Sequence, residues 1–257
     1  MPINLESVRP LPAERLHVEV YSTRTDMGNA AAHDVVKKMK ELLAEKERIR
    51  MIFAAAPSQN EFLAGLTHAD GIDWSRVTVF HMDEYFGLPE DDPRRFSRFL
   101  ADRLFDIVRP GEVNLIDTSR GLETECKRYG ELLRAEPIDI VCLGIGENGH
   151  IAFNDPWVAD FNDTKTVKIV QLDEACRNQQ VHDGCFPNLE AVPTHAITLT
   201  IPILMAGAYL YCIVPGKTKQ NAVKRTLYGP ITPDCPASVL RRHPNCTLYL
   251  DKDSYGN

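Results

Sequence analysis

A short apolar segment followed by a glycine-rich turn, over residues 138–156 (IDIVCLGIGENGHIAFNDP), constrains this chain more than any other stretch. Residues 138–143 are almost entirely apolar or β-branched, which is typical of a strand buried on both faces of a parallel sheet. A tight turn is then imposed by Gly144, Gly146 and Gly149. The turn delivers His150 and Asp155 outside the carboxyl end of the strand, where ligands collect in open α/β sheets. The segment therefore predicts a buried strand that ends at a chemical site.

Strand-like apolar segments alternate with helical patterns along the rest of the chain, which is typical of βαβ units and a mainly parallel sheet. We expect strands over residues 51–56, 77–81, 138–143, 166–171, 196–199, 208–214 and 247–250. We expect helices over residues 26–47, 61–68, 96–108, 122–133 and 219–227, with Asp26 as the first N-cap. Residues 154–192 carry few periodic signals, and we interpret them as a mobile or ligand-covering segment. No repeat or linker marks a boundary, so one domain over residues 1–257 is predicted.

The composition argues against several classes of function. The net charge is −7, and lysines and arginines are mixed with acidic residues, so nucleic acid is not an expected partner. The N-terminus lacks the apolar core of a signal peptide, and no segment approaches the roughly 20 apolar residues that span a bilayer, so a cytoplasmic protein without membrane contact is expected. The seven cysteines form an odd set with no Cys-x-x-Cys pair, which favours neither a disulfide framework nor a zinc site.

Residues 144–149 (GIGENG) also match the dinucleotide fingerprint G-x-G-x-x-G after a strand. That fingerprint requires a helix to start at its third glycine, whereas Asn154, Asp155 and Pro156 interrupt a helix within two turns. A nicotinamide cofactor is therefore not expected.

Two further strand ends carry candidate site residues. In residues 77–89 (VTVFHMDEYFGLP), Asp83 and Glu84 are adjacent, so only one of them can face a given pocket if the backbone stays extended. Two solvated acids in a loop are the alternative interpretation. Because the turn with His150 and Asp155 is a second strand end that carries titratable groups, we favour a functional site. Lys219 follows the strand at 208–214 and precedes a helix, a position in which a lysine suits a phosphate or another anion.

With these three turns, the chain resembles the glucosamine-6-phosphate deaminase family, in the superfamily that also contains 6-phosphogluconolactonases. The resemblance is carried by FHMDEYFGLP (80–89) and GIGENGHIAFNDP (144–156), and more weakly by residues 197–223 and 243–251. It implies an open, mostly parallel, doubly wound (Rossmann-like) sheet with helices on both faces. It also implies an aldose–ketose isomerisation coupled to loss of ammonia, acting on a small-molecule sugar or sugar phosphate without a cofactor or a metal.

The resemblance also implies roles for individual residues. Asp83 would move a proton between C2 and C1 of the open-chain amino sugar, and His150 would open the sugar ring. Asp155 stands where the family has a glutamate that supports this histidine, and Asn148 stands where the family has an aspartate. The substrate-binding residues would be Ser58, Gln59, Glu84, Gly146, Gly149, Arg177 and Lys219.

The departures from the family pattern carry predictions of their own. Asn148 can orient an imidazole but cannot stabilise an imidazolium by charge, and the corresponding change in the serine protease triad costs about 10⁴-fold in turnover. The family's small-residue phosphate turn reads AAAPSQNEF (54–62) here, and its arginine falls on Gln180, which leaves Arg177 or Arg225 as substitutes. Weakened ring opening and weakened phosphate binding are therefore expected.

Two alternatives remain open. A lactonase-type hydrolase of the same fold would need only a positioned water and a base, although the segments MDEY and AFNDP argue against it. A non-catalytic sugar-binding protein is the other alternative, and Asn148 and the altered turn at 58–61 are its motivation. A homo-oligomer is compatible with an enzyme of this kind, but the sequence identifies no interface.

Overall fold

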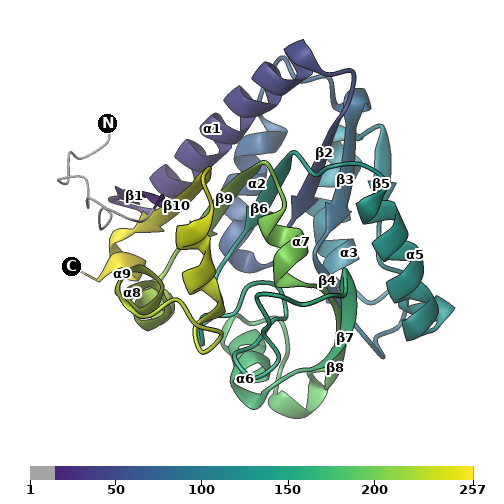
Figure 1. Cartoon of the computed structure of the whole chain (residues 1–257), viewed down its shortest axis with the longest axis vertical. Coiled ribbons are helices and arrows are strands. Elements are labelled where there is room, and N and C mark those ends of the chain that lie inside the picture. Colours follow the sequence, from purple (N-terminus) through teal and green to yellow (C-terminus); the bar gives the residue numbers. More distant parts are fainter. Residues whose placement is uncertain (1–14, 257) are drawn as a thin grey trace.

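A seven-stranded parallel sheet forms the centre of the molecule in this computed structural model, which describes residues 15–256 (Figure 1). The strand order is β1-β10-β9-β6-β2-β3-β5, and every neighbouring pair is parallel. In chain order the strands are β1 (His17–Tyr21), β2 (Ile49–Phe53), β3 (Val77–His81), β5 (Glu112–Asn114), β6 (Ile140–Leu143), β9 (Tyr209–Val214) and β10 (Cys246–Asp251). The α/β class with a mostly parallel sheet is thereby confirmed.

Three strands form a second, antiparallel sheet in the order β4-β8-β7. They are β4 (Asp83–Tyr85), β7 (Val167–Gln171) and β8 (His195–Leu199). The sequence patterns missed the short strands β4 and β5 as well as β1 near the N-terminus. They also placed the second strand of the chain at 51–56, whereas β2 ends at Phe53 because residues 54–59 leave the sheet to form a turn at the cavity described below.

Nine α-helical segments lie between or after the strands in the described part of the chain. They are α1 (Arg24–Glu45), α2 (Asn60–Thr67), α3 (Phe96–Leu100), α4 (Asp106–Val108), α5 (Leu122–Arg134), α6 (Glu174–His182), α7 (Ile201–Met205), α8 (Gln220–Tyr228) and α9 (Lys252–Tyr255). Helix α1 begins before the predicted N-cap Asp26, because the Thr23 hydroxyl accepts a hydrogen bond from the Asp26 N–H at 3.1 Å. The helix expected over 96–108 is interrupted by a π-helical turn at Ala101–Phe105.

The two faces of the main sheet bury separate apolar clusters, because successive side chains of a strand point to opposite faces. In β2, Met51 and Phe53 belong to a cluster that includes residues of α1, α2 and α3. Ile52, between them, belongs to a second cluster that includes residues of α5, α7 and α8. Strands buried on both faces must be apolar almost throughout, which explains the unbroken hydrophobic segments of the sequence.

The order of the strands reverses between β2 and β6. From β2 the chain continues through β3 to β5, whereas from β6 it continues in the other direction through β9 to β10. Such a switch point opens a crevice at the carboxyl ends of the strands. The turns after β2, β3, β6 and β9 all emerge at this edge, and β4 of the small sheet follows β3 after the single residue Met82.

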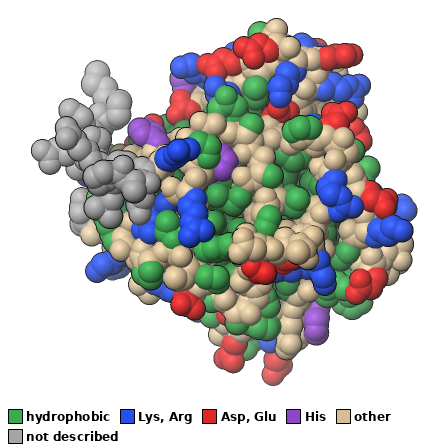
Figure 2. Space-filling view, in the orientation of Figure 1, with side chains coloured by type: hydrophobic (Ala, Val, Ile, Leu, Met, Phe, Trp, Pro, Cys, Tyr) green, Lys and Arg blue, Asp and Glu red, His purple; other side chains and the backbone are tan. Residues whose placement is uncertain are grey.

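Figure 2 presents one face of the molecular surface. Basic side chains are interspersed with acidic ones there, as the sequence predicts. Within residues 15–256, no helix combines the length and the apolar character needed to cross a membrane.

Candidate active site

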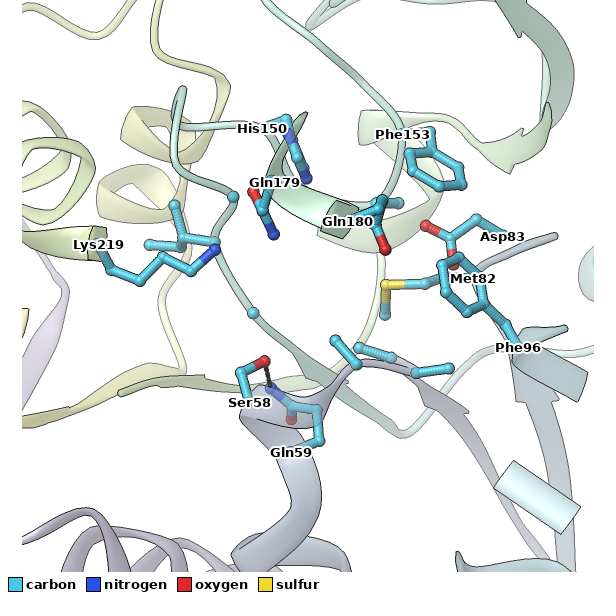
Figure 3. Close-up of a pocket in the computed structure, with 17 residues that line it drawn as sticks. Ser58, Gln59, Met82, Asp83, Phe96, His150, Phe153, Gln179, Gln180 and Lys219 are labelled. Carbon is cyan, nitrogen blue, oxygen red and sulfur yellow. Dashed lines mark hydrogen bonds between the residues drawn. The ribbon is translucent and has the colours of Figure 1, made fainter. Parts of the chain in front are cut away.

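A cavity opens at the switch point, between the four strand-end turns and helix α6 (Figure 3). Six of the predicted site residues line it, namely Ser58, Gln59, Asp83, Gly146, His150 and Lys219. Figure 3 shows Asp83 and Lys219 on opposite sides of the cavity, with His150 and Ser58 on the other two sides. The lining therefore has an acidic end and a basic end, and an imidazole lies between them.

Asp83 supplies the acidic end from strand β4, where it pairs with Thr198 of β8. Its side chain is buried, and no hydrogen bond to its carboxylate occurs within residues 15–256. Burial, with a smaller contribution from the charge of Glu84, raises the pKa of Asp83 well above its ordinary value. A carboxyl group in this setting exchanges a proton readily with whatever occupies the cavity.

Glu84 does not line the cavity, where its predicted role in substrate binding would place it. Because β4 is extended, the Glu84 side chain points away from the side that Asp83 faces. Its carboxylate accepts hydrogen bonds from the N–H groups of Phe96 (3.1 Å) and Ser97 (2.9 Å) at the start of α3. It also lies 3.5 Å from the guanidinium Nε of Arg95. Glu84 is therefore a buried anchor between the small sheet and α3.

The turn that carries His150 depends on glycine at two positions. A Cβ at residue 146 would lie 2.1 Å from Cε1 of His150, so only glycine allows the imidazole to pack against this backbone. Gly149 has a φ of 93°, and a Cβ there would also lie 2.8 Å from Sγ of Cys235. Gly149 shapes the turn and does not itself line the cavity, which corrects its predicted place among the substrate-binding residues.

The imidazole of His150 is held through its Nδ1 atom. Nδ1 lies 2.8 Å from Oδ1 of Asn148 and 3.1 Å from Oδ1 of Asp155. Both oxygens are acceptors, because the Asn148 amide donates through Nδ2 to Asp155 at 2.9 Å. Nδ1 must then carry the hydrogen, and Nε2 is left as the basic atom of the neutral ring.

Asp155 supplies the negative charge of this group. Burial raises the pKa of Asp155, but the hydrogen bonds and the charge of His150, together with the Asn148 amide, outweigh burial and hold the pKa below its ordinary value. Asp155 is buried beneath His150 and does not line the cavity, so it acts on a substrate only through the imidazole.

Asn148 lies between two carboxylates. Its Nδ2 donates to Asp155 and lies 3.4 Å from Oδ2 of Asp173, while its Oδ1 also accepts the His150 backbone N–H at 3.0 Å. An aspartate at this position would face Asp155 and Asp173 with a third negative charge. The amide is thus the group that fits these particular neighbours.

Lys219 supplies the basic end from the turn Lys217–Lys219 that precedes α8. No carboxylate lies within salt-bridge distance of its ammonium in the described part of the chain. Burial lowers the pKa of Lys219, although the charges of Asp183 and Glu147 oppose this shift. A buried cation without an ionic partner is a suitable receptor for an anion.

The turn after β2 faces Lys219 across the cavity with polar but uncharged groups. The Gln59 amide is buried, donating to the Ile213 carbonyl at 3.1 Å and to the Ser58 hydroxyl at 3.2 Å. Glu61 does not bring its charge into the cavity, because its carboxylate binds Arg24 Nε at 2.7 Å.

Neither arginine proposed as a substitute reaches the cavity. Arg177 donates to the carbonyls of Leu189 (2.6 Å) and Val192 (3.0 Å), and it does not line the cavity, where its predicted role in substrate binding would place it. Arg225 donates to the Asn148 carbonyl at 3.3 Å.

Helix α6 presents Gln179 and Gln180 to the cavity instead, and the Gln179 side chain accepts the Glu147 N–H at 2.8 Å. Sequence analysis left this helix inside an unassigned segment. The signal that could have found it is its N-cap, Asp173, whose carboxylate accepts the Cys176 N–H.

Comparisons with known proteins identify relatives of the chain. A family model described as glucosamine-6-phosphate isomerases/6-phosphogluconolactonase matches residues 22–249. A glucosamine-6-phosphate deaminase of Bacillus cereus (strain B4264) is 38% identical over 220 residues, which cover 85% of this chain and 81% of the relative. A solved monomeric glucosamine-6-phosphate deaminase superposes with a TM-score of 0.84 and 29% identity, covering 93% of this chain and 98% of its own. The 6-phosphogluconolactonase of Thermotoga maritima superposes with a TM-score of 0.76 at 22% identity, over 92% of this chain and 100% of its own, which indicates a shared fold alone.

Proposed function

Because the chain belongs to the glucosamine-6-phosphate isomerase/6-phosphogluconolactonase family, we propose that it converts an amino-sugar phosphate, glucosamine 6-phosphate, to the ketose phosphate with release of ammonia. The observation that carries the proposal is the shared cavity of Asp83, His150 and Lys219, which come from three separate strand-end turns. An anionic phosphate suits the Lys219 end, and the reacting carbons of the sugar would then lie toward Asp83, which is on the opposite side of the cavity (Figure 3).

His150 opens the ring in this proposal. The imidazole takes the proton of the C1 hydroxyl and delivers a proton to the ring oxygen as the bond between C1 and that oxygen breaks. Asp155 and Asn148 hold Nδ1–H, so Nε2 is the atom that exchanges these protons.

Asp83 then transfers the proton between carbons. Its carboxylate removes the proton from C2 of the open-chain aldehyde while the aldehyde oxygen takes a proton that the substrate ammonium releases, which gives a neutral enolamine; Asp83 then returns its proton to C1, which gives the protonated ketimine with a hydroxyl group on C1. Water adds to the ketimine carbon, and ammonia leaves to give the ketose. No group other than a base on one side of the sugar is needed for the C2-to-C1 transfer, and a buried carboxyl group of raised pKa suits that task.

The test measures ammonia and ketose together when the purified protein is incubated with glucosamine 6-phosphate. Asp83→Asn keeps the shape of the side chain and removes the base, so both products should fall by at least about 10²-fold. The matched control is Asp91→Asn, an exposed acid in the loop after β4, which should leave the rate unchanged. Equal ammonia release by the Asp83 variant and the wild type would refute the mechanism.

Two further substrates separate the alternatives. Hydrolysis of a 6-phosphogluconolactone without any deamination would favour the lactonase-type reading. Thermal stabilisation by the amino sugar without turnover would favour a binding protein.

The cytoplasmic location expected from the sequence and the possible homo-oligomeric state stay predictions.

A further inference from the structure

Three residues with metal-ligating side chains meet next to the cavity, at the Nδ1 side of His150. One ligand atom from each of His150, Asp155 and Cys176 lies within 4.8 Å of the other two, and all three residues are buried. The separation of 3.1 Å between His150 Nδ1 and Asp155 Oδ1 is close to the roughly 3.3 Å between two ligands about 2.0 Å from one tetrahedral ion. The group opens on the cavity through His150, the member of the three that lines it.

One polar atom of this group makes no hydrogen bond among residues 15–256. It is Oδ2 of Asp155, which is buried, whereas Oδ1 of the same carboxylate is engaged by both Asn148 and His150. A buried carboxylate oxygen without a donor is costly to leave unsatisfied, and a cation would satisfy it.

The electrostatic surroundings also favour a cation. Cys176 lies in the first turn of α6, where its N–H is bound by the N-cap Asp173 at 2.6 Å. Burial, followed by the nearby charges of Asp155 and Asp173, raises the pKa of the Cys176 thiol well above its ordinary value. The same negative field that disfavours a free thiolate favours a thiolate bound to a divalent ion.

We propose that His150, Asp155 and Cys176 form an inhibitory binding site for a thiophilic divalent cation such as Zn²⁺ or Cd²⁺. One imidazole, one carboxylate and one thiolate suit these ions and not Mg²⁺ or Ca²⁺, which prefer oxygen ligands. Three protein ligands leave a fourth position for a water molecule from the cavity. The sequence does not reveal the site, because its ligands come from the β6 turn, the segment after it and α6.

Metal binding at this site would remove the base from the reaction. The ion takes the Nδ1 lone pair of His150, so the ring proton moves to Nε2, and the Cys176 thiol releases its proton to solvent. Nε2–H then faces the cavity and no longer accepts a proton from the sugar. This consequence rests on the function proposed above, whereas the binding of the metal does not.

Binding is tested first, without substrate, by titrating the whole purified protein with Cd²⁺ and recording the ultraviolet absorption of the cadmium–thiolate bond. Cys176→Ala should remove the band, whereas Cys185→Ala, which changes a more exposed cysteine beyond the same helix, should keep it. If thermal melting shows that the alanine variant does not fold, Cys176→Ser serves in its place. A band that persists without Cys176, or no band in the wild type, overturns the proposal.

Inhibition is tested second, by the ammonia assay with Zn²⁺ and then with excess chelator. The chelator should restore the wild-type rate, and Mg²⁺ should have no effect. Cys176→Ala should keep the basal rate and should require at least about 10-fold more Zn²⁺ for the same inhibition. This factor is a lower bound, because residues that only hydrogen-bond to a metal ligand already contribute about 10- to 100-fold to metal affinity. Equal Zn²⁺ sensitivity of this variant and the wild type would refute the inhibitory role. If the wild type shows no deaminase activity at all, the proposed function fails, and the cadmium titration still decides the metal site.

Discussion

Replacing Asn148 by aspartate tests how the group around His150 is held together. In the family pattern an aspartate occupies this position, so restoring it could be expected to improve ring opening. The structure predicts the opposite, because the Asn148 amide donates to Asp155 at 2.9 Å and lies 3.4 Å from a carboxylate oxygen of Asp173. An aspartate would exchange an attractive contact with each of these carboxylates for a repulsive one.

The size of the effect follows from these distances. Two unit negative charges at 2.9 Å repel by about 6 kcal/mol at an effective dielectric constant of about 20, before the side chains relax. The lost hydrogen bond to a charged acceptor adds about 1.5–3 kcal/mol. After relaxation we expect Asn148→Asp to lower the free energy of unfolding by about 3 kcal/mol or more at neutral pH, and the turnover to fall with it.

Two further variants isolate the charge. Asn148→Ala removes the donor without adding a charge, so it should cost less stability than Asn148→Asp. Adding Asp155→Asn to Asn148→Asp leaves one carboxylate and one amide on Nδ1, and it should recover part of the loss. The coupling energy of this double-mutant cycle is the measured quantity.

Urea unfolding at several pH values is the assay. The difference between wild type and Asn148→Asp should shrink as the pH falls, because protonation of one carboxylate ends the repulsion. An Asn148→Asp variant that is as stable as the wild type and turns over faster would refute the reasoning, and it would show that the missing aspartate limits this chain.

Three other predictions follow from buried groups. Burial lowers the pKa of His81 to about 3, so below about pH 6.5 the unfolded chain binds a proton that the folded chain excludes. The free energy of unfolding should therefore keep its full value above about pH 6.5 and decrease by up to about 1.4 kcal/mol per pH unit as the pH falls toward 3. His81→Gln should flatten this part of the profile in urea unfolding, and an unchanged slope would contradict the assignment. Glu84→Gln should lower the free energy of unfolding by about 3 kcal/mol or more, because it leaves the buried Arg95 without its charge partner and turns an amide toward the N–H groups of α3. A loss below about 1 kcal/mol would contradict the role of Glu84 as a buried anchor. Lys219→Met should raise KM for the phosphorylated substrate by about 10- to 100-fold and leave kcat nearly unchanged. Thermal melting should show a more stable protein, because the substitution removes a buried cation that has no ionic partner among the described residues. A fall in kcat at constant KM would instead show that Lys219 takes part in the chemical step.

The sequence predicted the residues whose positions depend on the parallel sheet. Asp83, His150 and Lys219 each follow a strand end, and parallel strands bring their carboxyl ends to one edge whatever the details of the loops. The mainly parallel character of the sheet was predicted from the alternation of strands and helices alone, whereas the strand order was not predicted.

The residues that were misplaced depend on contacts between distant segments. Which of Asp83 and Glu84 faces the cavity is decided by the pairing of β4 with β8, more than 100 residues later in the chain. The side chain of Arg177 is bound by two backbone carbonyls beyond α6, a contact that the sequence pattern does not indicate. The proximity of Asp155 and Cys176 arises in the same way, from a helix that has no strong hydrophobic periodicity.

The opposite charges of Asp83 and Lys219 explain why this cavity suits an amino-sugar phosphate. Each group is buried without an ionic partner in the described residues, so each is destabilised in its charged form when the cavity holds no ligand. Glucosamine 6-phosphate carries an anion at one end and an amine beside the carbon that loses its proton. A phosphate near Lys219 favours the ammonium form of the lysine, and a protonated amine near Asp83 favours the carboxylate form of the acid. Because the substrate itself stabilises the carboxylate, a substrate with both charges favours the basic form of Asp83 more than a neutral sugar does.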